Sequence, residues 1–118
     1  MTFCSNFVHC TGQVTVNGGS ATSSNAGGGS GGSINIETNE LEGSGTVTAN
    51  GGRGHGSGGG GSGGRISVRW KSQRFSFLDF QSYGGQGAQN GGAGTIYFQV
   101  KKLEINFFLN CKQNCFRG

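Results

Sequence analysis

Proline is absent from this chain of 118 residues, and apolar residues are scarce. Apolar residues make up 31% of the chain, against roughly 45–50% in ordinary globular domains. A conventional thick core is therefore not expected. The lack of proline, together with glycines that show no period of three, excludes a collagen triple helix. The chain also lacks a run of 18 apolar residues, so no transmembrane helix is expected.

Charged residues are also few, at 12% of the chain with a net charge of +4. Disorder usually goes with high net charge and few aromatic residues. Because aromatic residues here reach 10%, the composition favours an ordered chain. The mild positive charge gives only a weak preference for anionic partners. No segment has an apolar period of 3.6 residues, so no helix is predicted.

Glycine is abundant instead, with 27 residues, and it recurs in a repeated pattern. The tract GGGSGG occupies residues 27–32 and 59–64, and a shortened copy, GGAG, occupies residues 91–94. These tracts define a unit of about 32 residues that is present in nearly three copies. An alternating apolar segment follows each tract and begins at Ile34, Ile66 and Ile96.

Each unit is predicted to hold two short strands joined by a glycine-rich corner. Apolar residues alternate at a period of two, which indicates half-buried strands. Asn-Gly-Gly at 17–19 and 50–52 is predicted to form a tight turn, because Asn-Gly tolerates positive φ. The glycines that follow are expected to supply positive-φ conformations and to let stacked units approach closely. The predicted core ladder consists of Val14, Val16, Ile34, Ile36, Val47, Ala49, Ile66, Val68, Phe80, Ile96 and Phe98.

The predicted fold class is an all-β solenoid fragment of about three glycine-rich coils. A unit with four or five core-facing apolar residues cannot bury them alone, whereas stacked units can. The chain is divided into an N-terminal cysteine-containing segment (1–11), the solenoid (12–100) and a C-terminal cap or tail (101–118). The acidic stretch ETNELE, residues 37–42, is expected to be a connecting loop with Leu41 turned inward. The alternative for the glycine tracts is a flexible linker.

The stretch GSGTVTANGG…GGGSGGRISV, Gly43 to Val68, resembles glycine-rich repeats of large extracellular and cell-surface proteins of protists and bacteria. The resemblance covers about Gly12 to Val100. It implies a right-handed parallel β-helix, similar to pectin-lyase-like folds or adhesin stalks, located outside the cell. The start of the chain lacks the basic and apolar regions of a signal peptide. An extracellular location therefore implies that these residues belong to a longer protein.

The four cysteines, Cys4, Cys10, Cys111 and Cys115, all lie outside the repeats. They allow three pairings, and in an oxidising compartment local Cys4–Cys10 and Cys111–Cys115 disulfides would hold the two ends. Zinc is the weaker alternative, because CKQNC has a zinc-like spacing and His9 could add a nitrogen ligand. Neither a metal nor a cofactor is predicted.

Catalysis is not predicted either. His55 lies in a glycine-rich loop with no acid nearby in the sequence to orient it. The chain has five carboxylates, of which three lie in ETNELE, a thin supply for a polysaccharide lyase or hydrolase. Thr46 and Thr48 begin a threonine row that Asp79 and Gln81 interrupt at the matching positions, so an ice-binding ladder is not predicted.

The predicted function is a non-enzymatic structural or adhesive module of a secreted or cell-surface protein. The expected partners are extracellular matrix or glycans, and further repeats of a longer chain. One alternative is a disordered, low-complexity protein that binds nucleic acid through Arg53 and Arg65, since arginine-glycine segments bind RNA. A second alternative is a carbohydrate-binding β-helix with Trp70 as a stacking aromatic residue.

Overall fold

The computed structural model describes residues 1–71 and 78–100. The described residues form strands and contain no helix, so none of them belongs to a helix able to cross a membrane. The all-β prediction is confirmed for this part of the chain. The strands are β1 (Thr2–Cys10), β2 (Gln13–Thr15), β3 (Ser33–Gly43), β4 (Thr46–Thr48), β5 (Arg65–Trp70), β6 (Asp79–Gln81) and β7 (Thr95–Val100).

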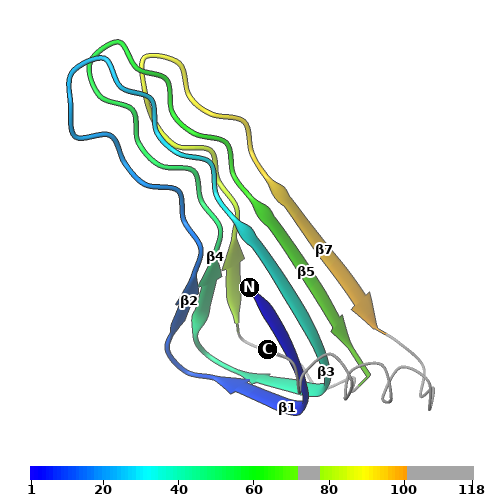
Figure 1. Ribbon diagram of the computed structural model, residues 1–118. Helices are drawn as coiled ribbons and strands as arrows, with labels where there is room; N and C mark the ends of the chain where they lie inside the picture. Colours follow the sequence, from blue (N-terminus) through cyan, green and yellow to red (C-terminus); the bar gives the residue numbers. More distant parts are fainter. Residues whose placement is uncertain (72–77, 101–118) are drawn as a thin grey trace.

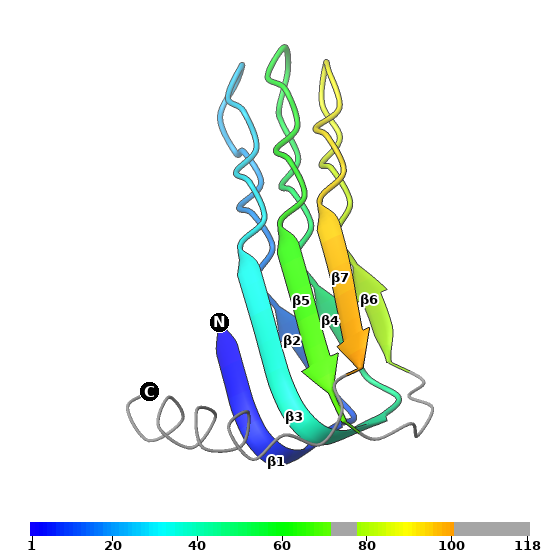
Figure 2. The same ribbon diagram turned by 90° about the vertical axis from the view of Figure 1, so that its right-hand side faces the viewer.

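The strands form two sheets in which every pairing is parallel. The larger sheet has the order β1-β3-β5-β7 and the smaller one the order β2-β4-β6. Each repeat unit therefore contributes one strand to each sheet, and the two sheets lie face to face (Figures 1 and 2). The register aligns equivalent positions of successive units, because Ile34 lies opposite Ile66 and Ile66 opposite Ile96.

The apolar core lies between the two sheets and follows the alternation of the strands. The predicted ladder residues Ile34, Ile36, Val47, Ala49, Ile66 and Val68 are at most 2% exposed. Val14, Val16 and Phe80 pack against this core and are partly buried. Ile96 and Phe98, in contrast, are 37% and 48% exposed. Both belong to β7, the edge strand of the larger sheet, where no described strand lies beyond them.

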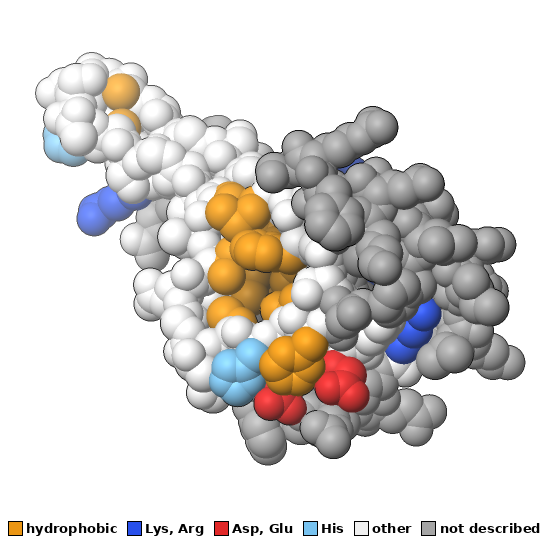
Figure 3. All heavy atoms as spheres, turned by 60° about the horizontal axis from the view of Figure 1, so that its bottom comes forward, with side chains coloured by type: hydrophobic (Ala, Val, Ile, Leu, Met, Phe, Trp, Pro, Cys, Tyr) orange, Lys and Arg blue, Asp and Glu red, His pale blue; other side chains and the backbone are white. Residues whose placement is uncertain are grey.

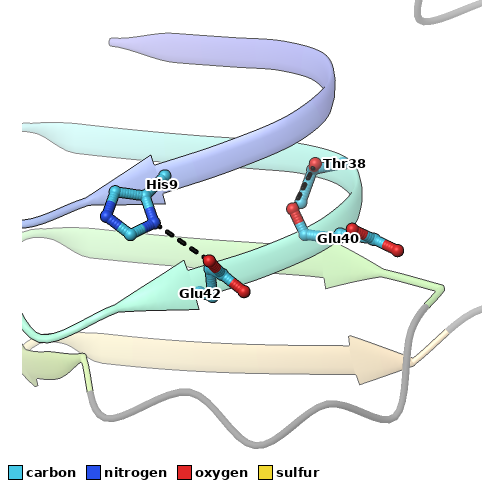
Figure 4. A network of polar contacts seen from close by, with 4 residues as sticks. All are labelled: His9, Thr38, Glu40 and Glu42. Carbon is cyan, nitrogen blue, oxygen red and sulfur yellow. Dashed lines mark hydrogen bonds and ion pairs between the residues drawn. The ribbon is translucent and has the colours of Figure 1, made fainter.

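Strand β3 continues through the acidic stretch at 37–42, so the loop predicted there is wrong. Leu41 does turn inward, as predicted, and is 3% exposed. The strand bends between Thr38 and Leu41. At this bend the spacing between buried residues changes from two positions to three. At the bend the buried Thr38 hydroxyl donates a hydrogen bond of 2.9 Å to the carbonyl oxygen of Glu40 (Figure 4), which satisfies an otherwise costly polar group.

Strand β1 repeats this bend, and it pairs with β3 along its length at an offset of 33 positions. Ser5 lies opposite Thr38. Its hydroxyl donates to the carbonyl oxygen of Phe7 at 3.1 Å, the same two-residue reach as at the bend of β3. The N-terminal segment, set apart from the repeat by its sequence, thus joins the same sheet as the repeat strands.

Three glycine-rich segments connect the two sheets, and each is an arm that runs out to a tip and returns (Figures 1 and 2). Arm 1 comprises residues 16–32, arm 2 residues 49–64 and arm 3 residues 82–94. The Asn-Gly-Gly positions lie in the outgoing runs of arms 1 and 2 and form no turn, so the turn predicted there is wrong. The chain reverses at the tips instead, for example at residues 56–57 of arm 2.

Backbone hydrogen bonds recur at every third residue of the arms. The N–H groups of Gly18 and Ala21 donate to the carbonyl oxygens of Asn50 and Arg53, each at 2.8 Å. This period is that of the polyproline II conformation, which has three residues per turn and no internal hydrogen bonds. Successive N–H groups therefore point toward different neighbouring runs. Returning runs follow the same rule, with Gly28 and Gly31 donating to Gly59 and Ser62, and Gly29 and Gly32 donating to Gly19 and Val16.

Along the arms glycine is required for close approach and, except at Gly56 in the tip of arm 2, not for positive φ, which corrects half of the predicted role. Among the described glycines, only Gly43 and Gly56 have positive φ. A Cβ atom at Gly61 would overlap the carbonyl oxygen of Gly29, and one at Gly52 would overlap that of Gly19. As in collagen, neighbouring backbones can hydrogen-bond at this spacing only when no side chain stands between them.

Candidate functional site

The layer of glycine arms is the candidate interaction surface. It extends the described structure well beyond the two sheets (Figure 1), which contributes to overall dimensions of 52 × 29 × 21 Å. Within the arms, most inward positions are glycine, with Ala49 and Ser82 buried at the bases of arms 2 and 3, and most polar side chains stand on the outside. Equivalent positions of successive arms lie side by side (Figure 2), so a residue type that recurs in the repeat becomes a row on the surface.

An asparagine row runs along the base of the arms. The Asn17 Oδ1 atom accepts the backbone N–H of Asn50 at 2.8 Å, and the Asn50 Oδ1 atom accepts that of Tyr83 at 2.7 Å. Each bond spans 33 positions and links one arm to the next. The asparagine of the Asn-Gly-Gly motif thus joins arms to one another, a role that the sequence prediction of a turn missed.

The arm tips carry exposed polar groups held by short-range and arm-to-arm bonds. Asn25 takes positive φ, at 62°, and its Oδ1 atom accepts both the N–H and the hydroxyl of Ser57, at 3.1 and 2.5 Å. His55 follows the outgoing run of arm 2, where its N–H donates to the carbonyl oxygen of Ala26. These contacts fix the backbone of the first two tips relative to each other and leave the His55 ring exposed.

The arginines proposed for nucleic-acid binding lie on different elements. Arg53 is exposed near the tip of arm 2, where its N–H donates to the Ser20 hydroxyl at 3.1 Å. Arg65 is the first residue of β5, at the base of the same arm. Further along β5, Arg69 forms an ion pair of 3.2 Å with Glu37. The described structure therefore distributes these cations along the chain and does not gather them into one patch.

A second candidate is an apolar cavity of about 280 Å³ at the end of the molecule where β1 and β2 lie. Figure 3 shows hydrophobic side chains gathered in a hollow on this face. The volume is close to the lower limit of roughly 300 Å³ for small-molecule pockets. Apolar side chains from both sheets line it, together with Cys10 and His9, and they are Phe3, Val8, Val14, Ile36, Leu41, Val47 and Leu78.

His9 and Glu42 form an ion pair beside this cavity, which sequence reasoning missed (Figure 4). The His9 Nδ1 atom lies 3.2 Å from Glu42 Oε1, and the side chains are 49% and 38% exposed. The His9 ring also stacks on Phe7, with ring centroids 6.1 Å apart. The sequence does carry a signal for this pair, because the two residues are 33 positions apart, which is close to the length of the repeat unit.

The cysteine arrangement differs from the predicted one. Cys4 is disulfide-bonded and Cys10 is a free thiol, so the predicted Cys4–Cys10 disulfide is wrong. The physical reason is that both residues lie on β1, six positions apart, where a strand rises about 3.3 Å per residue and a disulfide requires Cα atoms within about 7 Å. Cys111 and Cys115, with their predicted pairing, lie outside the described residues.

The remaining candidates do not come together into a reactive site within residues 1–71 and 78–100. No group of three or more His, Cys, Asp or Glu side chains there could hold a metal ion. His55 lies at an arm tip, away from the His9–Glu42 pair on β1 and β3. Trp70 packs edge-on against Phe98, with ring centroids 6.0 Å apart. Thr48 donates to the Thr15 hydroxyl at 3.0 Å, and Asp79 and Gln81 of β6 bond to each other.

Comparison of the chain with protein-family models, curated proteins and solved structures finds no match.

Proposed function

We propose that this chain is a non-enzymatic structural or adhesive module, built as a right-handed parallel β-solenoid of about three glycine-rich coils. Three features support the solenoid. Each repeat unit contributes one strand to each parallel sheet. Equivalent residues stack in register, as Val14, Val47 and Phe80 do in the smaller sheet. The arms carry the same unit-to-unit register beyond the sheets.

The observation that carries the proposal is the hydrogen bonding between arms along their full length. From the base, where Val16 donates to Thr48, to the tip, where His55 donates to Ala26, each arm is bonded to its neighbour. The arms can therefore project as an ordered layer without an apolar core of their own. A layer of this kind suits a spacer or an adhesive surface, because it holds rows of polar side chains at fixed spacing.

The disulfide at Cys4 supports a secreted or cell-surface location. Disulfides persist in oxidising compartments, while the cytosol keeps most thiols reduced. The expected consequence is a thermal unfolding midpoint, measured by far-UV circular dichroism, that falls when a reductant is added. A midpoint that does not change with reductant would argue against a structural role for this disulfide and remove the support for an extracellular location.

Hydrogen exchange tests the structural part of the proposal against the disordered alternative. Amides at the centre of the layer, such as those of Gly52, Gly61 and Gly85, are expected to be protected, because each donates to a carbonyl oxygen within the layer. The exposed amides of Gly19 and Gly92 serve as internal references. Uniformly fast exchange across the arms would show that they are disordered and would revive the nucleic-acid-binding alternative.

Adhesion is tested by binding the purified chain to immobilised matrix proteins and to a panel of glycans. A variant that replaces the exposed tip residue His55 with glycine changes the surface, and a folded control retains the tips but carries Ser62→Ala on the returning run. Tyr83 and Tyr97, which are 63% and 48% exposed, are the aromatic residues to replace for glycan binding. Failure of the folded wild-type chain to bind either panel would leave only the structural role.

A further inference from the structure

The two edges of the arm layer differ, and the edge formed by arm 1 has unused bonding groups. Arm 2 bonds to arm 1 through the N–H groups of Asn50, Gly52 and Arg53, at 2.8, 2.8 and 3.1 Å. The groups that accept these bonds are Asn17 Oδ1, the carbonyl oxygen of Gly29 and Ser20 Oγ. On arm 1 the N–H groups equivalent to those three donors belong to Asn17, Gly19 and Ser20, and they have no hydrogen-bond partner among the described residues.

Glycine is retained at this edge where no described atom requires it. A Cβ atom at Gly52 would overlap the carbonyl oxygen of Gly19 on the preceding arm, and one at Gly85 would overlap that of Gly52. The equivalent residue of arm 1 is Gly19, and a Cβ atom there would meet nothing within 4 Å. Gly19 is exposed, whereas Gly52 and Gly85 are buried. The edge thus keeps the one residue type that would let another backbone approach it.

The opposite edge, formed by arm 3, carries side chains at the positions where another arm would need glycine. A Cβ atom at Gly28 or Gly60 would overlap a carbonyl oxygen of the following arm, and arm 3 has Asn90 at the equivalent position. A Cβ atom at Gly63 would likewise overlap the following arm, and arm 3 has Ala93 there. The interface between arms can therefore be continued at the arm 1 edge and is closed by side chains at the arm 3 edge.

We propose that the arm 1 edge is a docking site for a glycine-rich partner segment with the pattern of arm 2, in the same extended conformation and parallel to arm 1. The segment would accept hydrogen bonds from the backbone N–H groups of Asn17 and Gly19, through the atoms equivalent to Asn50 Oδ1 and the Gly61 carbonyl oxygen, which accept the same bonds from arm 3. It is not arm 3 of a second copy, because Asn90 and Ala93 would collide with arm 1. This site is the edge of the layer, so the proposal holds whether or not the arm tips adhere to matrix.

The register of β1 allows a tethered test in the full chain. Thr2 lies opposite Asn35, and the Asn35 N–H donates to the carbonyl oxygen of Met1, so Met1 is equivalent to Ile34 and Ile66. A second copy of residues 46–65 fused directly before Met1 would therefore place its arm beside arm 1. The fused chain is expected to unfold at a Tm at least about 4 °C higher than the parent chain. Exchange of the Asn17 and Gly19 amides is expected to slow.

The variant Gly19→Ala separates docking from folding. In the parent chain its Cβ atom meets nothing within 4 Å, so Tm is expected to stay within about 2 °C of the wild type. In the fused chain the same Cβ atom would overlap the added arm, and the gain in Tm is expected to disappear. The control is Gly92→Ser, which also enters open space and restores the residue found at Ser30 and Ser62. It should leave both chains unchanged.

A free peptide with the sequence of residues 46–65 provides a second readout, in case the fused chain does not fold. Its addition to the parent chain should shift the NMR amide signals of Asn17 and Gly19, and Gly19→Ala should abolish those shifts. An unchanged Tm of a folded fused chain, or an equal effect of Gly19→Ala in both chains, overturns the proposal. Self-association of the parent chain that Gly19→Ala removes would assign the edge to a second copy, and it overturns the proposal as well.

Discussion

The two sheets and the layer of arms stack the same three units at the same register, yet opposite means hold them together. In the sheets, side chains fill the space between the layers, as Ile34 and Ile66 do at 1% and 0% exposure. In the arms, backbones fill the interior, and a single Cβ atom at Gly61 would overlap a neighbouring carbonyl oxygen. One region is therefore specified by the side chains it has, and the other by the side chains it lacks.

This difference predicts that the arms depend on the sheets. A backbone hydrogen bond contributes only about 0.5–1.5 kcal/mol net, and ordered glycine loses more conformational entropy than any other residue. The arms thus gain little from each residue that they order. The strands at their base fix the register at which neighbouring arms meet, because β2, β4 and β6 lead directly into arms 1, 2 and 3.

The largest expected effect is on the side-chain core. Ile66→Ala removes the central residue of the Ile34–Ile66–Ile96 ladder, which is fully buried, and should lower the free energy of unfolding by about 2–5 kcal/mol. The matched control is Ile96→Ala, which should cost clearly less because Ile96 is 37% exposed. Urea unfolding measures both. Equal losses would mean that Ile96 is as well packed as Ile66 in solution.

The next largest effect should come from adding one methyl group to the arm interior. Gly61→Ala places a Cβ atom against the carbonyl oxygen of Gly29 and should cost about 1–3 kcal/mol, as overpacking does in a close-packed interior. Two positions away, Gly59→Ala is the control, because the nearest atom, the Gln89 carbonyl oxygen, would be 3.5 Å from its Cβ atom. If the two variants unfolded at the same urea concentration, the arms would not be packed as described.

A smaller loss is expected when the asparagine row is interrupted. Asn50→Ala removes the Oδ1 atom that accepts the N–H of Tyr83 at 2.7 Å and should cost about 1 kcal/mol. It should also speed hydrogen exchange at the Tyr83 amide. Ser62→Ala, at an exposed site whose hydroxyl has no partner among the described residues, should change neither quantity. Unchanged exchange at Tyr83 in Asn50→Ala would contradict the bond between arms.

The smallest effect is expected at the ion pair between β1 and β3. Glu42→Gln removes the charge that faces His9 across 3.2 Å, in a pair with both side chains more than a third exposed. Solvent-exposed pairs contribute little, so the free energy of unfolding should change by less than about 0.5 kcal/mol. Glu40→Gln on the same strand is the control. A loss of several times that size would show that the pair closes the end of the core.

Parts of this architecture were predictable from residue patterns alone. The period-two alternation predicted the strands at 34–36 and 66–68, and the constant offset between glycine tracts predicted that equivalent residues stack. The bend of β3 was not predictable from local pattern, because Glu37, Glu40 and Glu42 are typical of a loop. The strand continues there because Leu41 and Thr38 face the core and the Thr38 hydroxyl finds its own carbonyl partner.

The role of glycine shows the same limit. A glycine tract is compatible with a flexible linker, with positive-φ turns or with close packing, and the local sequence does not distinguish them. Only the neighbouring arms decide, because hydrogen bonds such as that from the Gly52 N–H to the Gly29 carbonyl oxygen exist when the arms lie side by side. The candidate site depends on the same contacts, so the unused donors at Asn17, Gly19 and Ser20 could not be found from the sequence.

The sequence by itself determined the repeat unit, the alternating strands and the residues that form most of the core, because these depend on period and on side-chain polarity. Tertiary structure decided the extended conformation of the arms, the pairing of β1 with β3, the disulfide state of Cys4 and the difference between the two edges of the arm layer. These features depend on which segments of the chain meet in the folded structure, and local residue preferences do not encode such contacts.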